Sequence, residues 1–497
     1  MADTSTLDLS LFRPVTARDF VIARASRDDY WDWLRHVASA GECRQPIRLR
    51  GEIYTVERTG DSAVILDVRH TADMPDGVIY KPCGNRRASI CPACSRVYQR
   101  DAYHLVRAGL VGGKGIPETV AEHPSLFVTL TAPSFGPVHT RPVAKHTCTN
   151  RRRCDCRPRP CHPGRDRATC EHGRPVVCWA RHELEDPQLG QPLCLDCYDH
   201  AAQVVWNNQA GELWRRTSLA ITRSIRRAAK RRGIDPDAVK VSFGKVAEMQ
   251  RRGAVHFHIV MRLDGRDPDN PDAILPPPAG LGLGDLVDAV EHAAKTVMFV
   301  TDPHPAKPSG WLIAWGEQID VRTINLGGGQ TITDSMVAGY LAKYATKSTE
   351  ATGHTSRRLD AETIDIYADP DGTHPERLVD ACWTLGAAGG PWRSLRRWAH
   401  MLGFGGHFLT KSRRYSVTFQ LLRETRVIWR QQQTTGPQRR DQGDAAEQTT
   451  TLVINFLEFV GSGWRNPGDA MLALSAAARA REQREAARDA LTTASAD

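Results

Sequence analysis

The spacing of apolar residues along the chain predicts a mixture of strands and helices. Strand-like runs occur at Glu52–Thr55, Leu126–Thr131 and Trp315–Ile324, a hairpin pattern at Val239–Leu263, and helical spacing at Ala201–Arg232, at Leu283–Phe299 and from Asp334 onward. A further, charged helix is predicted near the end of the chain, at Ala470–Leu491. We find no internal repeat, so the chain is not expected to be a solenoid or an array.

The turn of the hairpin at Val239–Leu263 can be identified from the sequence. Its two apolar strands flank the tripeptide Arg-Arg-Gly at 251–253, which fits a three-residue turn whose glycine adopts the left-handed conformation. In this register Glu248 lies directly opposite His256, and directly paired residues share a face of the sheet. A register shift of one residue would move Glu248 to the other face.

The second strand of this hairpin carries two histidines. His256 and His258 are two residues apart, so both imidazoles project from one face, while Phe257 projects from the other. Together with Glu248 they predict a mixed nitrogen and oxygen site for a divalent metal ion. Two alternatives stay open. The histidines can be a structural pair, and Glu248 can form an ion pair with an arginine of the turn.

Tyrosines and lysines share one face of the helix predicted from Asp334. That face comprises Tyr340, Lys343, Tyr344 and Lys347, and a neighbouring apolar stripe of Val337, Leu341 and Ala345 can pack the helix. Each tyrosine has a lysine three residues later, which can lower the pKa of the phenol and stabilise phosphate charge. Because a tyrosine hydroxyl can attack phosphorus when a metal ion polarises the phosphate, we interpret both tyrosines as candidate nucleophiles. The alternative is an ordinary amphipathic surface.

The charge of the chain favours a polyanionic partner. Its 497 residues carry a net charge of +9, and the pI is about 9.0. Basic runs such as 223–232 support nucleic-acid binding, although such runs are also common on solvated helix faces. The candidate DNA contacts are Arg251, Arg252, Lys411, Arg413 and Arg414. We see no membrane-length apolar run and no signal-peptide pattern, and therefore expect a cytoplasmic protein without a membrane partner.

The cysteines indicate bound zinc rather than disulfides, because a reducing compartment keeps thiols free. Cys91 and Cys94 form a Cys-x-x-Cys pair that, with Cys83 and Cys43, offers four thiolates for a closed structural zinc site. The alternative for Cys43, and the preferred interpretation of Cys382, is a buried apolar thiol.

A second Cys-x-x-Cys pair, Cys194 and Cys197, predicts another zinc ion. Cys170 and Cys178 are its nearest plausible partners, and His172 competes with them. The remaining cysteines, which follow no recognisable ligand spacing and could form a further site or stay free, are Cys148, Cys154, Cys156 and Cys161.

The length of the chain exceeds what one hydrophobic core supports, so several structural units are expected. We predict a zinc-binding N-terminal unit over 1–116 and a core over 117–350 with a cysteine-rich insertion at about 138–200. A basic extension would follow over 351–430, and a linker with a helical tail over 431–497.

The strand LFVTLT, the His-x-His pair and the double-tyrosine helix follow one another in the order of the three motifs of HUH endonucleases. More closely, FVTLTAPS, EMQRRGAVHFHIVMRLDG and GYLAKYATK resemble the replication initiator proteins of actinobacterial plasmids and integrative conjugative elements. CGNRRASICPAC and HMLGFGGHFLTKSRRYS are similar to that family as well. The resemblance therefore extends over Cys43–Thr418.

The resemblance implies an α+β fold of the HUH type, an antiparallel sheet with packed helices related to the RNA-recognition fold. It makes His256, His258 and Glu248 ligands of Mg²⁺ or Mn²⁺, and Tyr340, which we rank first, or Tyr344 the nucleophile. The implied function is plasmid replication initiation, in which one DNA strand is nicked and rejoined through a 5′-phosphotyrosine to start rolling-circle replication. The implied partner is origin DNA, single-stranded or extruded, with host helicase and polymerase as further candidates.

Two other functions fit parts of the sequence. A transposase or conjugative relaxase with the same motifs would use the same metal and tyrosine on different DNA. A zinc-containing DNA-binding regulator would bind DNA without a divalent ion and form no covalent adduct. The regulator leaves the joint occurrence of the His-x-His pair, Glu248 and the doubled Tyr-x-x-Lys unexplained.

Overall fold

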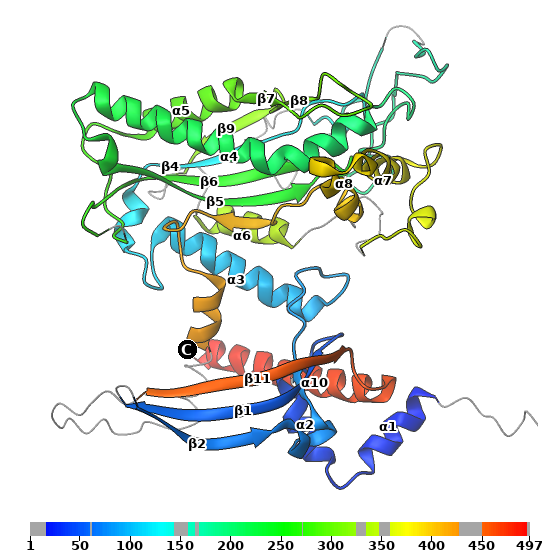
Figure 1. The fold of residues 1–497 in the computed structure, drawn as a ribbon, viewed down its shortest axis with the longest axis vertical. Coiled ribbons are helices and arrows are strands. Elements are labelled where there is room, and N and C mark those ends of the chain that lie inside the picture. The colour runs from blue at the N-terminus through cyan, green and yellow to red at the C-terminus, as the bar shows by residue number, and fades with distance from the viewer. Residues whose placement is uncertain are drawn as a thin grey trace, which may run out of the picture. The chain divides into compact units, whose positions relative to one another are not determined.

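The chain divides into two compact units in a computed structural model (Figure 1). The residues that the structure describes are 16–59, 62–143, 158–164, 168–270, 272–324, 334–346, 358–426 and 450–494. We call Met1–Tyr98 with Ile428–Asp497 the terminal unit and Gln99–Val427 the central unit. Among the described residues, no helix combines the length and apolarity needed to cross a bilayer.

The terminal unit joins both ends of the chain in one antiparallel sheet of order β11-β1-β2, with β3 also paired to β1. Its elements are α1 (Ala17–Ala25), α2 (Tyr30–Val37), β1 (Ile47–Thr59), β2 (Ser62–His70), β3 (Ile79–Lys81), β11 (Thr450–Ser462) and α10 (Pro467–Ala494), and α3 (Pro92–Val111) begins here. The predicted strand Glu52–Thr55 lies within β1, and the predicted tail helix is α10. Residues 450–494 do not form a separate tail, because β11 pairs along β1, while the predicted linker that precedes them lies outside the described residues. Local spacing cannot reveal such a distant pairing.

The central unit contains a five-stranded antiparallel sheet of order β10-β5-β6-β4-β9. Its strands are β4 (Ser125–Leu130), β5 (Val239–Met249), β6 (Val255–Gly265), β9 (Ile319–Thr323) and β10 (Leu409–Lys411), and β7 (Met298–Val300) pairs with β8 (Leu312–Ala314) in a separate ribbon. Its helices include α4 (His200–Arg231), α5 (Leu283–Thr296), α6 (Asp334–Ala345), α7 (His374–Leu385) and α8 (Arg393–Arg397). The mixed fold with an antiparallel sheet agrees with the α+β prediction.

The two faces of this sheet differ because successive side chains of a strand point to opposite sides. One face packs in the hydrophobic core against α4 and α5, through residues such as Phe257, Ile259 and Val128. The other face carries the histidines and contacts α6 (Figure 1). The apolar side of α6 is buried as its sequence predicts, with Val337 and Leu341 almost inaccessible to solvent.

The turn between β5 and β6 has the predicted register, with Glu248 opposite His256. Gly253 adopts the left-handed conformation, with a φ of +77°, and a Cβ there would lie 2.8 Å from the side chain of Leu402. Helix α4 fixes the turn, because the Asn207 amide donates a hydrogen bond of 2.8 Å to the carbonyl of Gly253 and accepts one of 3.0 Å from the backbone of Val255.

Several predicted boundaries are wrong. Helix α5 ends at Thr296 rather than Phe299, because β7 begins at Met298, and the predicted strand Trp315–Ile324 is shortened to β9. The predicted division at residue 116 lies inside the central unit, and the described residues 358–426 belong to that unit as well. The reason is packing, because Leu378, Leu395 and Phe408 belong to the same hydrophobic core as the strands.

Candidate active site and metal clusters

Glu248, His256 and His258 converge on the face of the sheet that α6 contacts. The Nε2 atoms of His256 and His258 lie 2.9 and 3.0 Å from the same carboxylate oxygen of Glu248. All three side chains are largely buried, with 14%, 3% and 13% of the side chains of His256, His258 and Glu248 exposed. The arrangement results from the alternation within β6 and from the register of the hairpin.

The spacing of these ligand atoms suits a small divalent ion. Adjacent ligands of an octahedral ion with bonds of about 2.1 Å lie about 3.0 Å apart. The two separations from the Glu248 oxygen match this value. Two imidazoles and one carboxylate also leave coordination positions for water or phosphate oxygens. The geometry therefore fits the predicted Mg²⁺ or Mn²⁺ site, although ion binding itself stays a prediction.

Strand β4 contributes two residues that sequence reasoning missed. Thr129 lies opposite His258, and its hydroxyl is 3.1 Å from Nδ1 of that imidazole. If Nδ1 donates to this hydroxyl, the lone pair of Nε2 faces Glu248, which is the tautomer a metal ligand needs. The ring of Phe127 stacks on His258 with centroids 5.9 Å apart. Their position inside the strand motif was visible in the sequence, but their pairing with β6 was not.

Helix α6 brings Tyr340 to the same site. Its hydroxyl lies 3.4 Å from Nε2 of His258, and its ring packs edge-on against both His258 and Phe127. The side chain of Tyr340 is partly exposed, so it is accessible from solvent. Lys343 is exposed on the same helix. The side chain of Tyr344 and all of Lys347 lie outside the described residues, so the predicted roles of both stay untested.

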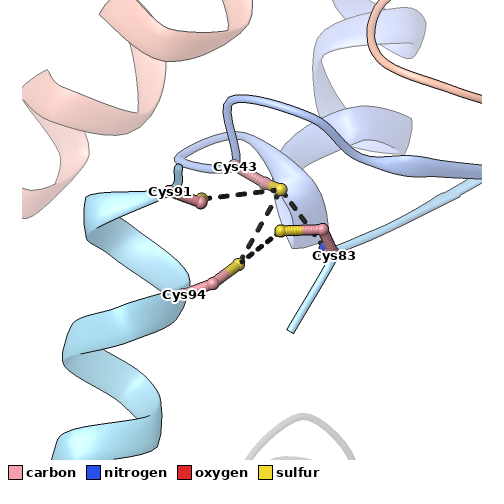
Figure 2. A group of neighbouring side chains, drawn as sticks. All are labelled: Cys43, Cys83, Cys91 and Cys94. Atoms are coloured by element: carbon pink, nitrogen blue, oxygen red, sulfur yellow. Dashed lines mark hydrogen bonds between the residues drawn. The ribbon is translucent and has the colours of Figure 1, made fainter. Parts of the chain in front are cut away.

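In the terminal unit, Cys43, Cys83, Cys91 and Cys94 form what we call the cysteine cluster (Figure 2). The sulfur of Cys43 lies 3.8 Å from those of Cys91 and Cys94, and the sulfurs of Cys83 and Cys94 are 3.7 Å apart. Four sulfurs around a tetrahedral zinc ion with bonds of about 2.3 Å would be about 3.8 Å apart. Hydrogen bonding with Cys43 lowers the pKa of the Cys94 thiol. The donors fit zinc.

The cysteine-rich insertion forms two further clusters. Cys170, His172, Cys194 and Cys197 lie together, so His172 takes the place that the sequence also offered to Cys178. We call this group the Cys194 cluster. Nδ1 of His172 lies 3.2 Å from the sulfur of Cys197 and 3.9 Å from that of Cys194.

The grouping of Cys178 with Cys194 and Cys197 is wrong. Cys178 lies instead with His139, Cys161 and His182, which we call the His182 cluster. The reason is a short antiparallel pairing of 160–162 with 178–180, which no ligand spacing in the sequence indicated. Cys148, Cys154 and Cys156 lie outside the described residues. Cys382 is fully buried and belongs to none of the clusters found among the described residues, as its assignment to the core predicts.

Most of the predicted DNA contacts are engaged within the protein. Arg251 donates to the carbonyls of Leu184 and Asp186, and Arg252 donates to those of Ala132 and Pro133. A role in DNA binding stays a prediction for both arginines, which have structural partners.

The basic residues at the end of β10 and just after it differ in exposure. The ammonium of Lys411 lies 3.1 Å from the carbonyl of Arg413, and burial lowers its pKa. Arg414 forms an ion pair with Asp272. The side chain of Arg413 is exposed, so it is the best placed of the three for a phosphate.

Comparisons with known proteins agree with one another. The family model RepSA, described as "Replication initiator protein, pSAM2", matches residues 29–478. A curated "Replication initiator protein" of Streptomyces ambofaciens is 40% identical over 488 residues, which cover 97% of each chain. No solved structure gives a significant match. The matched region is wider than Cys43–Thr418, over which the sequence motifs were found, and includes most of both units.

Proposed function

Because this chain belongs to the pSAM2 replication initiator family, we propose that it is a metal-dependent endonuclease of the HUH type that nicks one strand of origin DNA and keeps the 5′ end on a tyrosine. The single observation that carries the proposal is the position of the Tyr340 hydroxyl, 3.4 Å from a histidine that shares a carboxylate oxygen with a second histidine. The antiparallel sheet, with this His-x-His pair on an inner strand, supports an HUH-type fold.

The side chains at this site include the metal ligands, the nucleophile and the cation that a phosphoryl transfer to tyrosine requires. A divalent ion bound by Glu248, His256 and His258 would polarise the scissile phosphate. The hydroxyl of Tyr340 would give its proton to water as its oxygen bonds to phosphorus, and the bond to the 3′ oxygen would break. That oxygen takes up a proton and leaves as a free 3′ hydroxyl, while the 5′ phosphate stays on the tyrosine. Lys343 would stabilise charge on the phosphate.

This chemistry suits an initiator of rolling-circle replication. The free 3′ hydroxyl can prime a host polymerase behind a helicase, and the phosphotyrosine keeps the bond energy needed to rejoin the strand. We rank Tyr340 as the initiating nucleophile because its hydroxyl reaches the metal ligands. Tyr344 and Lys347 are proposed to act from the same helix, in the closing reaction and at the phosphate respectively.

We further propose that the cysteine cluster and the Cys194 cluster each hold a structural zinc ion. The ligand types and separations support closed tetrahedral sites. Purified protein should then contain tightly bound zinc, and Cys91→Ser should lower the free energy of unfolding without a selective effect on cleavage. A stable protein free of zinc would contradict both assignments.

The covalent adduct tests the catalytic proposal directly. Protein incubated with Mn²⁺ and a labelled single-stranded origin oligonucleotide should give a labelled band on a denaturing gel. Tyr340→Phe should lose the initiating adduct, and Tyr340→Phe with Tyr344→Phe should lose all of it. Tyr415→Phe is the matched control, because that tyrosine is fully buried elsewhere in the central unit. A label mapped outside 334–347, or an adduct in the double variant, would refute the mechanism.

A further inference from the structure

We propose that the His182 cluster (His139, Cys161, Cys178 and His182) binds a third zinc ion, and that this ion fixes the turn of the hairpin that carries Glu248 and His256. The metal site stands on the geometry of the cluster alone. Its effect on the hairpin rests on the proposed nicking activity.

The ligand atoms of the cluster have the separations of a tetrahedral zinc site. Nδ1 of His139 lies 3.2 Å from Nε2 of His182, the sulfur of Cys178 lies 3.6 Å from the same Nε2, and the sulfur of Cys161 lies 3.8 Å from Nδ1 of His139. Bonds of about 2.05 Å to nitrogen and 2.3 Å to sulfur give about 3.3 Å between two nitrogens and about 3.6 Å between nitrogen and sulfur. Two cysteines and two histidines are also a common donor set for structural zinc.

Neighbouring groups orient these ligands. Nδ1 of His182 lies 2.7 Å from the carboxylate of Asp186, so Nδ1 carries the proton and the lone pair of Nε2 points into the cluster. The backbone N–H of Thr140 donates a hydrogen bond of 3.1 Å to the sulfur of Cys161, which holds that sulfur in place. His182 and Cys161 are almost completely buried, which suits a closed site.

A zinc ion would hold together segments that, within the described part of the insertion, are joined by few backbone hydrogen bonds. Cys161 and Cys178 come from the paired segments 160–162 and 178–180, and His139 from the segment that follows β4. The backbone of His139 pairs with Gly190 and Gln191. The four ligands therefore close a loop between β4 and α4, whose described residues, 131–143, 158–164 and 168–199, contain little regular secondary structure to order it.

This loop contacts the turn of the β5–β6 hairpin, which carries Glu248 and His256. Arg251, in that turn, donates hydrogen bonds of 2.7 Å to the carbonyl of Leu184 and 2.9 Å to the carbonyl of Asp186, the residue that also orients His182. Gly190 approaches closely as well, because a Cβ there would lie 2.7 Å from the carbonyl carbon of Arg251. If zinc orders residues 182–190, these residues would hold Arg251 in place and so fix the β5–β6 turn, which begins three residues after Glu248.

A metal-free interpretation of the cluster also exists, in which Nδ1 of His139 donates a hydrogen bond to His182 across the same 3.2 Å. The two interpretations differ in zinc content. We therefore expect Cys178→Ser and His139→Ala, made in the full-length chain, each to contain one zinc ion per chain fewer than the unmodified protein by elemental analysis. Cys382→Ala is the control, because it removes a buried cysteine that lies outside every cluster found among the described residues.

The effect on the hairpin is tested by the dependence of cleavage on Mn²⁺. Cys178→Ser and Arg251→Ala should both raise the Mn²⁺ concentration for half-maximal cleavage by about threefold or more, at saturating DNA. Arg251→Ala should do so with its zinc content unchanged, because it breaks the contact and not the site. Saturating DNA removes any effect of Arg251 on DNA affinity from this measurement.

Each outcome decides one part of the proposal. Unchanged zinc content in both Cys178→Ser and His139→Ala would overturn the metal site, whatever the cleavage assay gives. Loss of zinc with an unchanged Mn²⁺ dependence would overturn the effect on the hairpin. If even the unmodified protein does not cleave, the proposed nicking activity fails, and zinc content still decides the site. Should Cys178→Ser not fold, Cys178→His, which restores a fourth zinc ligand, should recover both folding and zinc content.

Discussion

The two faces of the β5–β6 hairpin are made from alternating residues of the same strands, yet they have opposite characters. Phe257 is completely buried in the hydrophobic core, while its neighbours His256 and His258 meet Glu248 on the other face. The core face gains stability from apolar area removed from water. On the polar face two imidazoles lie against one carboxylate oxygen of Glu248, and all three side chains are largely buried. These contacts offset part of the cost of burying polar groups, and metal binding would give this face a function.

If this contrast is correct, changes on the polar face should affect catalysis and changes on the core face should affect stability. The largest effect is expected for His258→Ala. Loss of this ligand should lower the cleavage rate by about a thousandfold or more, because the phosphate is no longer polarised. Binding to origin DNA should stay close to that of the unmodified chain, because it depends mainly on basic residues elsewhere. Rate and binding are measured by adduct formation and by titration of labelled DNA.

Asn455→Ala, a change in β11 of the terminal unit, serves as a control that should leave the cleavage rate unchanged. A His258→Ala protein with full activity would remove the metal site from the mechanism.

The second largest effect is expected on the core face. Phe257→Ala should lower the free energy of unfolding by about 3–5 kcal/mol, because it leaves a cavity against Trp315 and Phe404. Denaturant titration measures this loss. Well below the unfolding midpoint, the folded fraction should keep its Mn²⁺ dependence of cleavage. A normal stability combined with a loss of activity would mean that the two faces are not separable in this way.

The same contrast explains what could be predicted from the sequence. The alternation His256, Phe257, His258 and the Arg-Arg-Gly turn are local, and they gave the register of Glu248 correctly. Thr129 and the pairing of β11 with β1 were missed, because they depend on contacts between segments far apart in the chain. The grouping of Cys178 failed because the short pairing of 160–162 with 178–180 places this cysteine beside Cys161. The sequence indicated which residues can bind zinc, but the tertiary fold decides which cysteines lie beside which histidines.

One residue breaks the apolar pattern of the core face. Lys245 is almost completely buried, with its ammonium 3.7 Å from the centre of the Phe257 ring, and burial lowers its pKa to about 7. An unfolded chain keeps the proton up to pH of about 10.4. Between the pKa of Lys245 in the folded protein and its pKa in the unfolded chain, the unfolded chain binds more protons than the folded protein, so the free energy of unfolding should rise with pH. Below pH of about 7 the folded protein bears the full cost of the buried ammonium.

Lys245→Met should therefore stabilise the protein, by about 2 kcal/mol or more at pH 7, with a gain that disappears as the pH rises towards 10. Denaturant titrations of both proteins at pH 6, 7, 8 and 9 measure the difference. Lys240→Met, a change in the same strand at a less buried lysine whose pKa burial lowers to about 8, should show a smaller gain. A Lys245→Met protein that is less stable at pH 7 would show that the ammonium makes a favourable interaction in the core.

Among these changes to the two faces of the hairpin, the smallest effect is expected for Glu248→Ala, on the polar face. His256 and His258 would still hold the ion, so activity should persist, but the Mn²⁺ concentration for half-maximal cleavage should rise by about tenfold. Glu248→Gln keeps the size and one oxygen ligand while it removes the charge, and should give an intermediate shift. The Mn²⁺ concentration for half-maximal cleavage should therefore rise from the unmodified protein to Glu248→Gln and then to Glu248→Ala. This order follows from the shared carboxylate oxygen, which lies 2.9 and 3.0 Å from the two imidazoles. If neither substitution changes the Mn²⁺ dependence, Glu248 is not a ligand, and its contact with the histidines is an ordinary buried ion pair that carries no catalytic role.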